Sequence, residues 1–285
     1  MSILRDKISA NRMKCQIYLS ISEVPPNFKL RSRLKFVQTE RNKSFILLFC
    51  LCYTNFALVM QDIITFLREL QANNHREWFM ANKARYTELQ AQFNRFVDEL
   101  IHEISRFDSS VTGLTAKDCT YRIYRDVRFS ADKRPYKTHM GAFICPGGKK
   151  SGYSGYYFHI GTGGDGYPYG HMLATGDYCC DPKVLQVLRE DIVGGGGDFD
   201  DIIRSVAPTF VLDHEGALKR NPKGFEQETL YTEYLRLKSF CLLHTPTDEF
   251  VCADNLAQRV AELFRLTQPF LHYINRAIAY VKEEG

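Results

Sequence analysis

The sequence lacks the motifs by which several large classes of enzyme and metal protein are recognised. Its nine cysteines include no C-x-x-C pair, and His102-Glu103 is not followed by a second histidine at zinc-protease spacing. Gly161–Gly166 is rich in glycine but lacks both the G-x-G-x-x-G pattern and the lysine of a phosphate-binding loop. Metal catalysis is therefore the weakest functional class, no motif indicates a cofactor, and reduced thiols are the favoured state of the cysteines.

The sequence also lacks an apolar run of the length that a transmembrane helix needs. Phe45–Met60 is apolar but is interrupted by Thr54 and Asn55, and it falls short of about 20 residues. More than forty residues precede it, which is atypical of a secretory signal. We interpret residues 1–59 as a poorly patterned leader, either disordered or upstream of a functional start at Met60, with a signal anchor as the weaker alternative. A chain starting at Met60 would be cytoplasmic and would not contact a membrane.

Positive charge is unevenly distributed along the chain. The first 59 residues hold ten of the 37 Lys and Arg residues and three of the 33 Asp and Glu residues. The rest of the chain therefore has 27 basic and 30 acidic residues, a net charge of −3. Such a body is not typical of a general nucleic-acid binder, so any basic surface must be local.

Hydrophobic periodicity predicts helices at both ends of the remaining sequence. Apolar residues recur every three or four positions from Gln61 to about Phe107, with a break at Asn73-Asn74. Either asparagine could cap the next helix, with Glu77 in capping-box position after Asn74. Asn255–Val281 has the same periodicity and predicts a C-terminal helix or helix pair.

The middle of the chain predicts strands. Thr120–Phe129, Thr138–Cys145 and Tyr153–Ile160 each have strand character. A further helix is predicted to begin at Asp181-Pro182 and to end at Gly194–Gly197. We therefore expect a single α+β domain over residues 60–285, with a central, mostly antiparallel sheet flanked by N-terminal and C-terminal helices.

The stretch most suggestive of function is Tyr121–His139, YRIYRDVRFSADKRPYKTH. Alternation would place Arg125 on an otherwise apolar strand face, where a guanidinium must be paired or bound. Several converging cations overcome their repulsion when an anion joins them, and guanidinium groups bind phosphate or carboxylate through two hydrogen bonds. The stretch therefore predicts a site for an anionic small molecule, and its candidate ligand-binding residues are Arg122, Arg125, Arg128, Lys133 and Lys137.

Three residues in or near this stretch are candidates for proton transfer. Asp126 could orient an arginine, or act as a base if its environment raised its pKa. His139 and His159 are the histidines closest to the basic stretch, and His159 shares a strand face with Tyr157. Asp126, His139 and His159 are therefore the candidate catalytic residues of a possible enzyme.

Two other interpretations stay open. In one, Asp126 and Asp132 pair with arginines in a salt-bridge network that only holds the fold of a non-catalytic scaffold. In the other, basic residues interleaved with aromatic rings bind a nucleic acid, a class disfavoured by the negative charge of the body.

Several stretches together resemble a known family. The pattern R-x-x-R-D-x-R-F-S-x-D-K-x-P-Y-K at Arg122–Lys137 is similar to the signature of domain of unknown function 2461. The likeness extends to NNHREWF at Asn73–Phe79, to GYYFHI at Gly155–Ile160 and to Leu237–Phe240, and it leaves residues 1–59 uncovered. The resemblance implies no particular reaction. The family's usual Gly-Gly-x-Tyr-x-Pro run is replaced here by the residues before Pro182, so the role of that loop is not carried over.

Overall fold

The computed structural model describes residues 35–37, 46–48, 56–163 and 170–284, and the chain divides into two compact units at Thr54/Asn55. In the first unit, β1 (Lys35–Val37) pairs antiparallel with β2 (Ile46–Leu48). The rest of the proposed leader up to the division lies outside the described residues. Within the described part of the chain, none of the helices combines the length and apolar character that crossing a bilayer requires.

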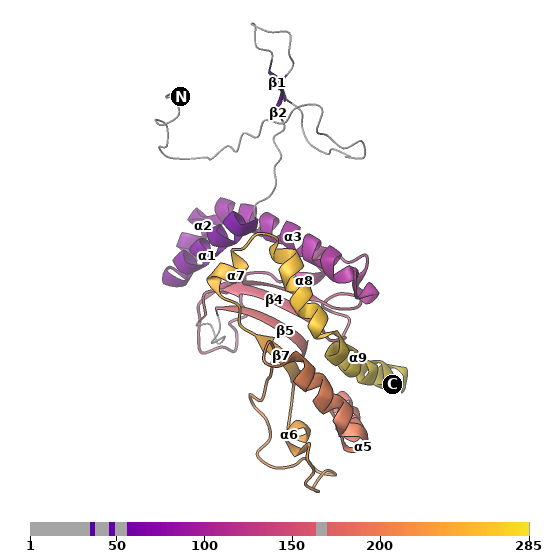
Figure 1. Ribbon diagram of the computed structural model, residues 1–285. Coiled ribbons are helices and arrows are strands. Elements are labelled where there is room, and N and C mark those ends of the chain that lie inside the picture. Colours follow the sequence, from indigo (N-terminus) through magenta and orange to yellow (C-terminus); the bar gives the residue numbers. More distant parts are fainter. Residues whose placement is uncertain (1–34, 38–45, 49–55, 164–169, 285) are drawn as a thin grey trace. The chain divides into compact units, whose positions relative to one another are not determined.

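The second unit is an α+β domain built on one five-stranded sheet (Figure 1). Every neighbouring pair of strands is antiparallel, in the order β3-β4-β5-β7-β6. The strands are β3 (His139–Ile144), β4 (Gly155–Gly161), β5 (His171–Asp177), β6 (Val211–Leu212) and β7 (Phe240–His244). This arrangement confirms the expected antiparallel sheet between N-terminal and C-terminal helices.

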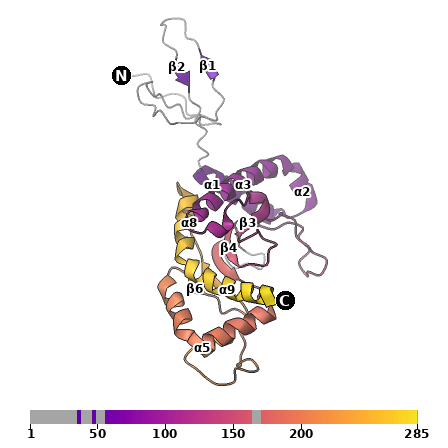
Figure 2. The same cartoon turned by 90° about the vertical axis from the view of Figure 1, so that its right-hand side faces the viewer.

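Along the sequence, some helices come before the strands of the sheet, and others lie between strands or after the last one. Those before the sheet are α1 (Phe56–Ala72), α2 (Arg76–Ala81), α3 (Lys83–Ser105), the 3₁₀ turn η2 (Ser109–Val111) and α4 (Ala116–Cys119). Those between or after the strands are α5 (Pro182–Val206), α6 (Thr232–Leu235), α7 (Asp248–Val251), α8 (Leu256–Leu266) and α9 (Gln268–Glu284). Asp181 caps α5 and Pro182 occupies its first turn, as the sequence predicts. Figure 2 shows α5 packed beside α9.

The helices pack against one face of the sheet, which we call the first face. Its side chains include Tyr156 and Phe158 on β4, and the Phe158 ring centroid lies 4.9 Å from that of Phe96 on α3. The Tyr156 ring lies 5.2 Å from Phe264 on α8. In Figure 1, α1 and α3 accordingly lie above the strands, and α8 descends across the level of β4 and β5. This apolar layer holds the sheet rigidly enough to position side chains on its other face.

Side chains that alternate with the first-face residues define the second face. Strand register places His159 beside Gly141 on β3 and Met172 on β5, while Tyr157 lies beside Phe143 and Ala174. The second face therefore carries a histidine and a tyrosine in neighbouring rows, between two strands that present small or apolar residues to them.

The structure corrects two predicted boundaries near the N-terminal helices. Helix α1 begins at Phe56 rather than Gln61, and Met60 is fully buried in the core instead of preceding the regular pattern. The cap of α2 is His75, whose Nδ1 accepts a hydrogen bond from the Trp78 backbone N–H. Neither asparagine caps this helix, because the side chain of Asn74 is engaged elsewhere.

Other sequence-based expectations change in the middle of the chain. Thr120–Phe129 is not a strand, since only isolated bridges at Thr120 and Tyr124 involve it. The glycine run does interrupt the helix, as predicted: Gly195 is non-helical, with φ −153° and ψ 38°, and α5 consists of two helical segments that meet at this kink, the second ending at Val206. The sequence pattern does not predict β5 or β6: β5 contains a glycine and lies between β4 and β7, and β6 has only two residues, which pair with β7.

Candidate functional site

Residues 121–138 form an irregular hairpin that we call the arm. Its two limbs are joined by backbone hydrogen bonds from Arg125 N–H to the Pro135 carbonyl and from Lys137 N–H to the Ile123 carbonyl. A proline and a polar turn keep this pairing from becoming a regular strand ladder. The predicted alternation nevertheless persists, because Ile123 is buried and Arg125 is half-buried while their neighbours are exposed.

The arm is anchored at its base to the corner between α1 and α2. The Asn74 side chain accepts a hydrogen bond from the Tyr136 backbone N–H at 3.1 Å and donates one to the Tyr136 carbonyl at 2.9 Å. The Tyr136 ring stacks on Phe79 with a centroid distance of 4.0 Å. The Asn74 side chain thus satisfies both backbone polar groups of Tyr136, as a neighbouring strand would.

Two aspartates neutralise three of the arm's arginines. Asp132 accepts from Arg125 at 2.7 Å and from Arg134 at 2.7 Å, and Arg125 also donates to the Arg134 carbonyl. These hydrogen bonds, from Arg134 first and then Arg125, hold the pKa of Asp132 well below its usual value. The expectation that Arg125 needs a partner is met within the arm itself.

The outer part of the arm carries a second ion pair. Asp126 accepts two hydrogen bonds from the Arg128 guanidinium, at 3.0 and 2.7 Å, and these lower the pKa of its carboxyl. The raised pKa that a base would need is therefore absent at Asp126. Lys133 donates to the Val127 carbonyl at 3.0 Å. A ligand would have to compete with these contacts for Arg125, Arg128 or Lys133.

Arg122 and Lys137 differ from the other cations of the arm. Among the described residues neither forms an ion pair with a carboxylate. Burial lowers the pKa of Lys137, and the positive charge of Arg122 lowers it further. The Lys137 ammonium lies over the Tyr121 ring, 5.4 Å from its centroid. Two neighbouring cations at the base of the arm thus repel each other, and Asp126, which is itself paired with Arg128, attracts Arg122 at longer range.

The two candidate histidines meet on the second face. The rings of His139 and His159 stack with a centroid distance of 4.2 Å, and His159 Nδ1 lies 3.2 Å from the Tyr157 hydroxyl. Burial lowers the pKa of His159 well below its usual value, with further lowering from His139, His171 and Lys137. His159 is therefore neutral at physiological pH.

Two glycines make room for this histidine pair. A Cβ atom at Gly141 would lie 2.7 Å from the Tyr157 hydroxyl oxygen. A Cβ at Gly161 would lie 2.6 Å from His159 Nε2 and 2.8 Å from the Cβ of His139. Alternation along β4 predicts that Tyr157 and His159 share a face. The close approach of Tyr157 to Gly141 depends on the pairing of β3 with β4, which the sequence does not show.

A third histidine, His171, lies buried on the first face of the sheet. Its Nδ1 accepts a hydrogen bond from the Gly161 backbone N–H at 3.3 Å, and its Nε2 lies 3.0 Å from Asp248. Because Nδ1 accepts, the ring proton is on Nε2 and is donated to the carboxylate. Asp248 also pairs with Arg68 of α1 at 2.7 Å, so His171 joins β5 to α7 and α1.

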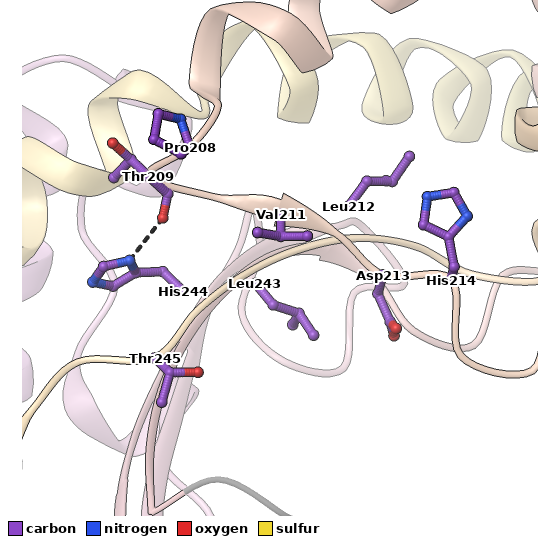
Figure 3. Close-up of a pocket in the computed structure, with 9 residues that line it drawn as sticks. All are labelled: Pro208, Thr209, Val211, Leu212, Asp213, His214, Leu243, His244 and Thr245. Carbon is purple, nitrogen blue, oxygen red and sulfur yellow. Dashed lines mark hydrogen bonds between the residues drawn. The ribbon is translucent and has the colours of Figure 1, made fainter.

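A separate pocket lies at the other end of the sheet, where β6 meets β7 (Figure 3). Val211 and Leu243 form its apolar centre, and His244 Nδ1 donates to the Thr209 carbonyl at 2.7 Å. None of the residues proposed from the sequence lines this pocket. In the described part of the chain, no group of three His, Cys, Asp or Glu side chains is placed to hold a metal ion.

These features define an antiparallel α+β protein with a braced basic arm beside a histidine pair. The chain belongs to the family described as conserved hypothetical protein (DUF2461), whose model matches residues 62–273. No curated protein and no solved structure matches the chain. Three of the four stretches that carry the family resemblance lie together, since Asn74 bonds to Tyr136 of the arm and Lys137 of the arm lowers the pKa of His159 on β4, while Leu237–Phe240 contacts α5.

Proposed function

We propose that the protein binds a small anionic molecule, phosphorylated or carboxylated, between Arg122 and Lys137 at the base of the arm. The observation that supports this most is the half-buried Lys137 beside Arg122, with no carboxylate partner among the described residues. A half-buried cation repelled by its neighbour is destabilised, and a counter-charge beside it would offset that cost. A phosphate or carboxylate would supply that charge and restore the ordinary pKa of the lysine.

The histidine pair could add proton transfer to this binding site. His159 is uncharged, buried and close enough to Lys137 for the lysine to lower its pKa. A neutral imidazole beside a bound anion can accept a proton from the ligand or from water. We therefore propose His139 and His159 as the proton-transfer residues. Asp126 is left out because its pKa is lowered.

The test is thermal unfolding of the full chain against phosphate, pyrophosphate, nucleotides and dicarboxylates. A ligand at a hundred times its dissociation constant stabilises the folded state by about 2.7 kcal/mol. Lys137→Met keeps the aliphatic stem over Tyr121 and removes the charge. We expect it to abolish the ligand-induced shift without lowering the unfolding midpoint of the ligand-free protein.

Lys282→Met is the matched control, because Lys282 also covers a tyrosine ring, with its ammonium 3.7 Å from the centroid of Tyr153. It should keep the ligand-induced shift. Arg125→Ala should lower the unfolding midpoint through loss of the Asp132 pair while retaining a shift with ligand. The proposal is wrong if none of these anions moves the midpoint, or if Lys137→Met responds like the unchanged protein.

A further inference from the structure

We infer that the outer part of the arm binds single-stranded nucleic acid, with Phe129 as a stacking platform. Phe129 is 97% exposed, an uncommon state for a phenylalanine. The Arg128 guanidinium lies 5.9 Å from the centroid of its ring and is itself 76% exposed at the side chain. Tyr124, further along the same limb, is 45% exposed.

The arm presents these side chains on a braced hairpin. Asp132 ties Arg125 to Arg134 across the two limbs, and Lys133 donates to the Val127 carbonyl close to the apex. The base is fixed by Asn74 on α1–α2. A partner would therefore meet an exposed ring whose supporting backbone is already ordered, which reduces the entropy lost on binding.

The pattern of side chains fits a nucleic-acid strand. Between Arg122 and Lys137 the arm has six basic and two acidic residues, interleaved with aromatic rings. Binding of single strands combines cations that follow the phosphate backbone with rings on which bases stack. Residues 60–285 have a net charge of −3, which opposes general binding of a polyanion, so contact with a nucleic acid would be confined to a local basic surface such as the arm.

A lipid surface would contact fewer of these side chains than a nucleic-acid strand. An anionic bilayer could take Phe129 and the cations at the apex, but Tyr124 lies toward the base, where it pairs with Tyr136. A nucleic-acid strand stacked on Phe129 can in addition place successive phosphates along the cations of the arm. We therefore favour a nucleic acid and make membrane binding an outcome of the test.

The experiment measures fluorescence anisotropy of labelled oligothymidine and oligouridine, each about 12 nucleotides long, with the full chain. Phe129→Ala should weaken binding about tenfold, because it removes one stacked base. Arg128→Gln should lower the slope of log affinity against log salt by about one, measured between about 50 and 200 mM. Phe129→Trp should retain binding and show quenching of the new indole when the oligonucleotide is added.

Matched controls separate the arm from general surface effects. Leu230→Ala changes an apolar side chain that is 92% exposed elsewhere, and Arg204 has the same 76% side-chain exposure as Arg128 and a similar pairing, with Asp200. Neither Leu230→Ala nor Arg204→Gln should change affinity. The basic residues before Asn55 contribute equally to all variants and cancel in the comparison.

Two results would overturn the inference. One is equal oligonucleotide affinity for Phe129→Ala and Leu230→Ala. The other is binding to phosphatidylserine vesicles that Phe129→Ala abolishes while oligonucleotide affinity is unchanged, which would assign the apex to a membrane. Phe129 and Arg128 take no part in the proposed small-anion site. Loss of oligonucleotide binding in Phe129→Ala with an intact small-anion shift would therefore separate the two proposals.

Discussion

At the scale of single residues, Gly141 is a position where one added methyl group would act directly on the ring beside the histidine pair. It lies on β3 opposite His159, and the Tyr157 ring crosses it so closely that a Cβ atom would lie 2.7 Å from the hydroxyl oxygen. Alanine would force the ring away from this position and disturb its hydrogen bond to His159.

We expect Gly141→Ala to lower the free energy of unfolding by about 1–3 kcal/mol, the usual cost of overpacking. Urea unfolding measures this change. Gly197→Ala on α5 is the control, since the nearest contact there is an ordinary 3.6 Å, and alanine should stabilise a helical position by about 0.5–1 kcal/mol. Adding Tyr157→Phe to Gly141→Ala should recover part of the loss. No recovery would mean that the ring hydroxyl is not the source of the clash.

His171 gives the protein a pH dependence that can be checked. Burial lowers the pKa of this ring, although Asp248 partly opposes the effect. The unfolded chain therefore binds a proton, at a pKa of about 6.5, before the folded protein does. The stability that comes from keeping the ring neutral is fully present above that pH, and it is lost as the pH falls toward the pKa of the folded protein. Buried His159 acts in the same direction.

We expect the free energy of unfolding to fall between pH 7 and pH 5, with a slope of at most about 1.4 kcal/mol per pH unit for each histidine. His171→Gln should reduce that slope, and a change at the exposed His102 should leave it unaltered. Asp248 stays ionised in this window because hydrogen bonds from Arg68 and His171 outweigh burial and lower its pKa. An unchanged slope in His171→Gln would contradict the assignment.

At the scale of elements, the arm depends on Asp132 more than on Asp126. Asp132 joins the two limbs, whereas Asp126 pairs with Arg128 two residues away on the same limb. We expect Asp132→Asn to speed tryptic cleavage after Arg128 several-fold, because the neutral amide leaves Arg125 and Arg134 without their shared carboxylate. Asp126→Asn should be cleaved at nearly the original rate. Equal cleavage in the two variants would show that the brace does not order the arm.

The elements also show what the sequence could and could not predict. Local chemistry was sufficient for the start of α5, where Asp181 and Pro182 suit the cap and first turn, and for β3 and β4. It failed for Thr120–Phe129, because an alternating pattern does not reveal whether a partner strand is present. The spacing from Glu77 predicts Asn74, or its neighbour Asn73, as a helix cap, but the side chain of Asn74 bonds to Tyr136, 62 residues away.

The candidate site was predictable to a similar degree. His139 and His159 were named because they are near the basic stretch, and their stacking depends on a register that places His159 opposite Gly141. The contrast between paired Arg125 and carboxylate-free Lys137 could not be read from a count of charges, because Asp132 serves two arginines at once.

At the scale of the whole molecule, the core reaches further toward the N-terminus than the sequence pattern indicates. Val59 and Met60 belong to the same buried cluster as Phe66 and Phe158, and Met60 has no exposed surface. Helix α1 begins at Phe56, just after the division between the two units. A boundary at Met60 would therefore cut through a helical turn that contributes to the core.

Two shortened chains test this boundary. A chain starting at Asn55 keeps all of α1 and should unfold at the same urea concentration as the full chain. A chain starting at Met60 loses Val59 and the first turn of α1, and it places a charged terminus next to a buried side chain. Loss of buried apolar area together with an incompletely solvated charge should reduce the free energy of unfolding by roughly 1–3 kcal/mol. Equal stability of the two shortened chains would show that the turn at Phe56–Val59 adds nothing to the core and would return the boundary to Met60.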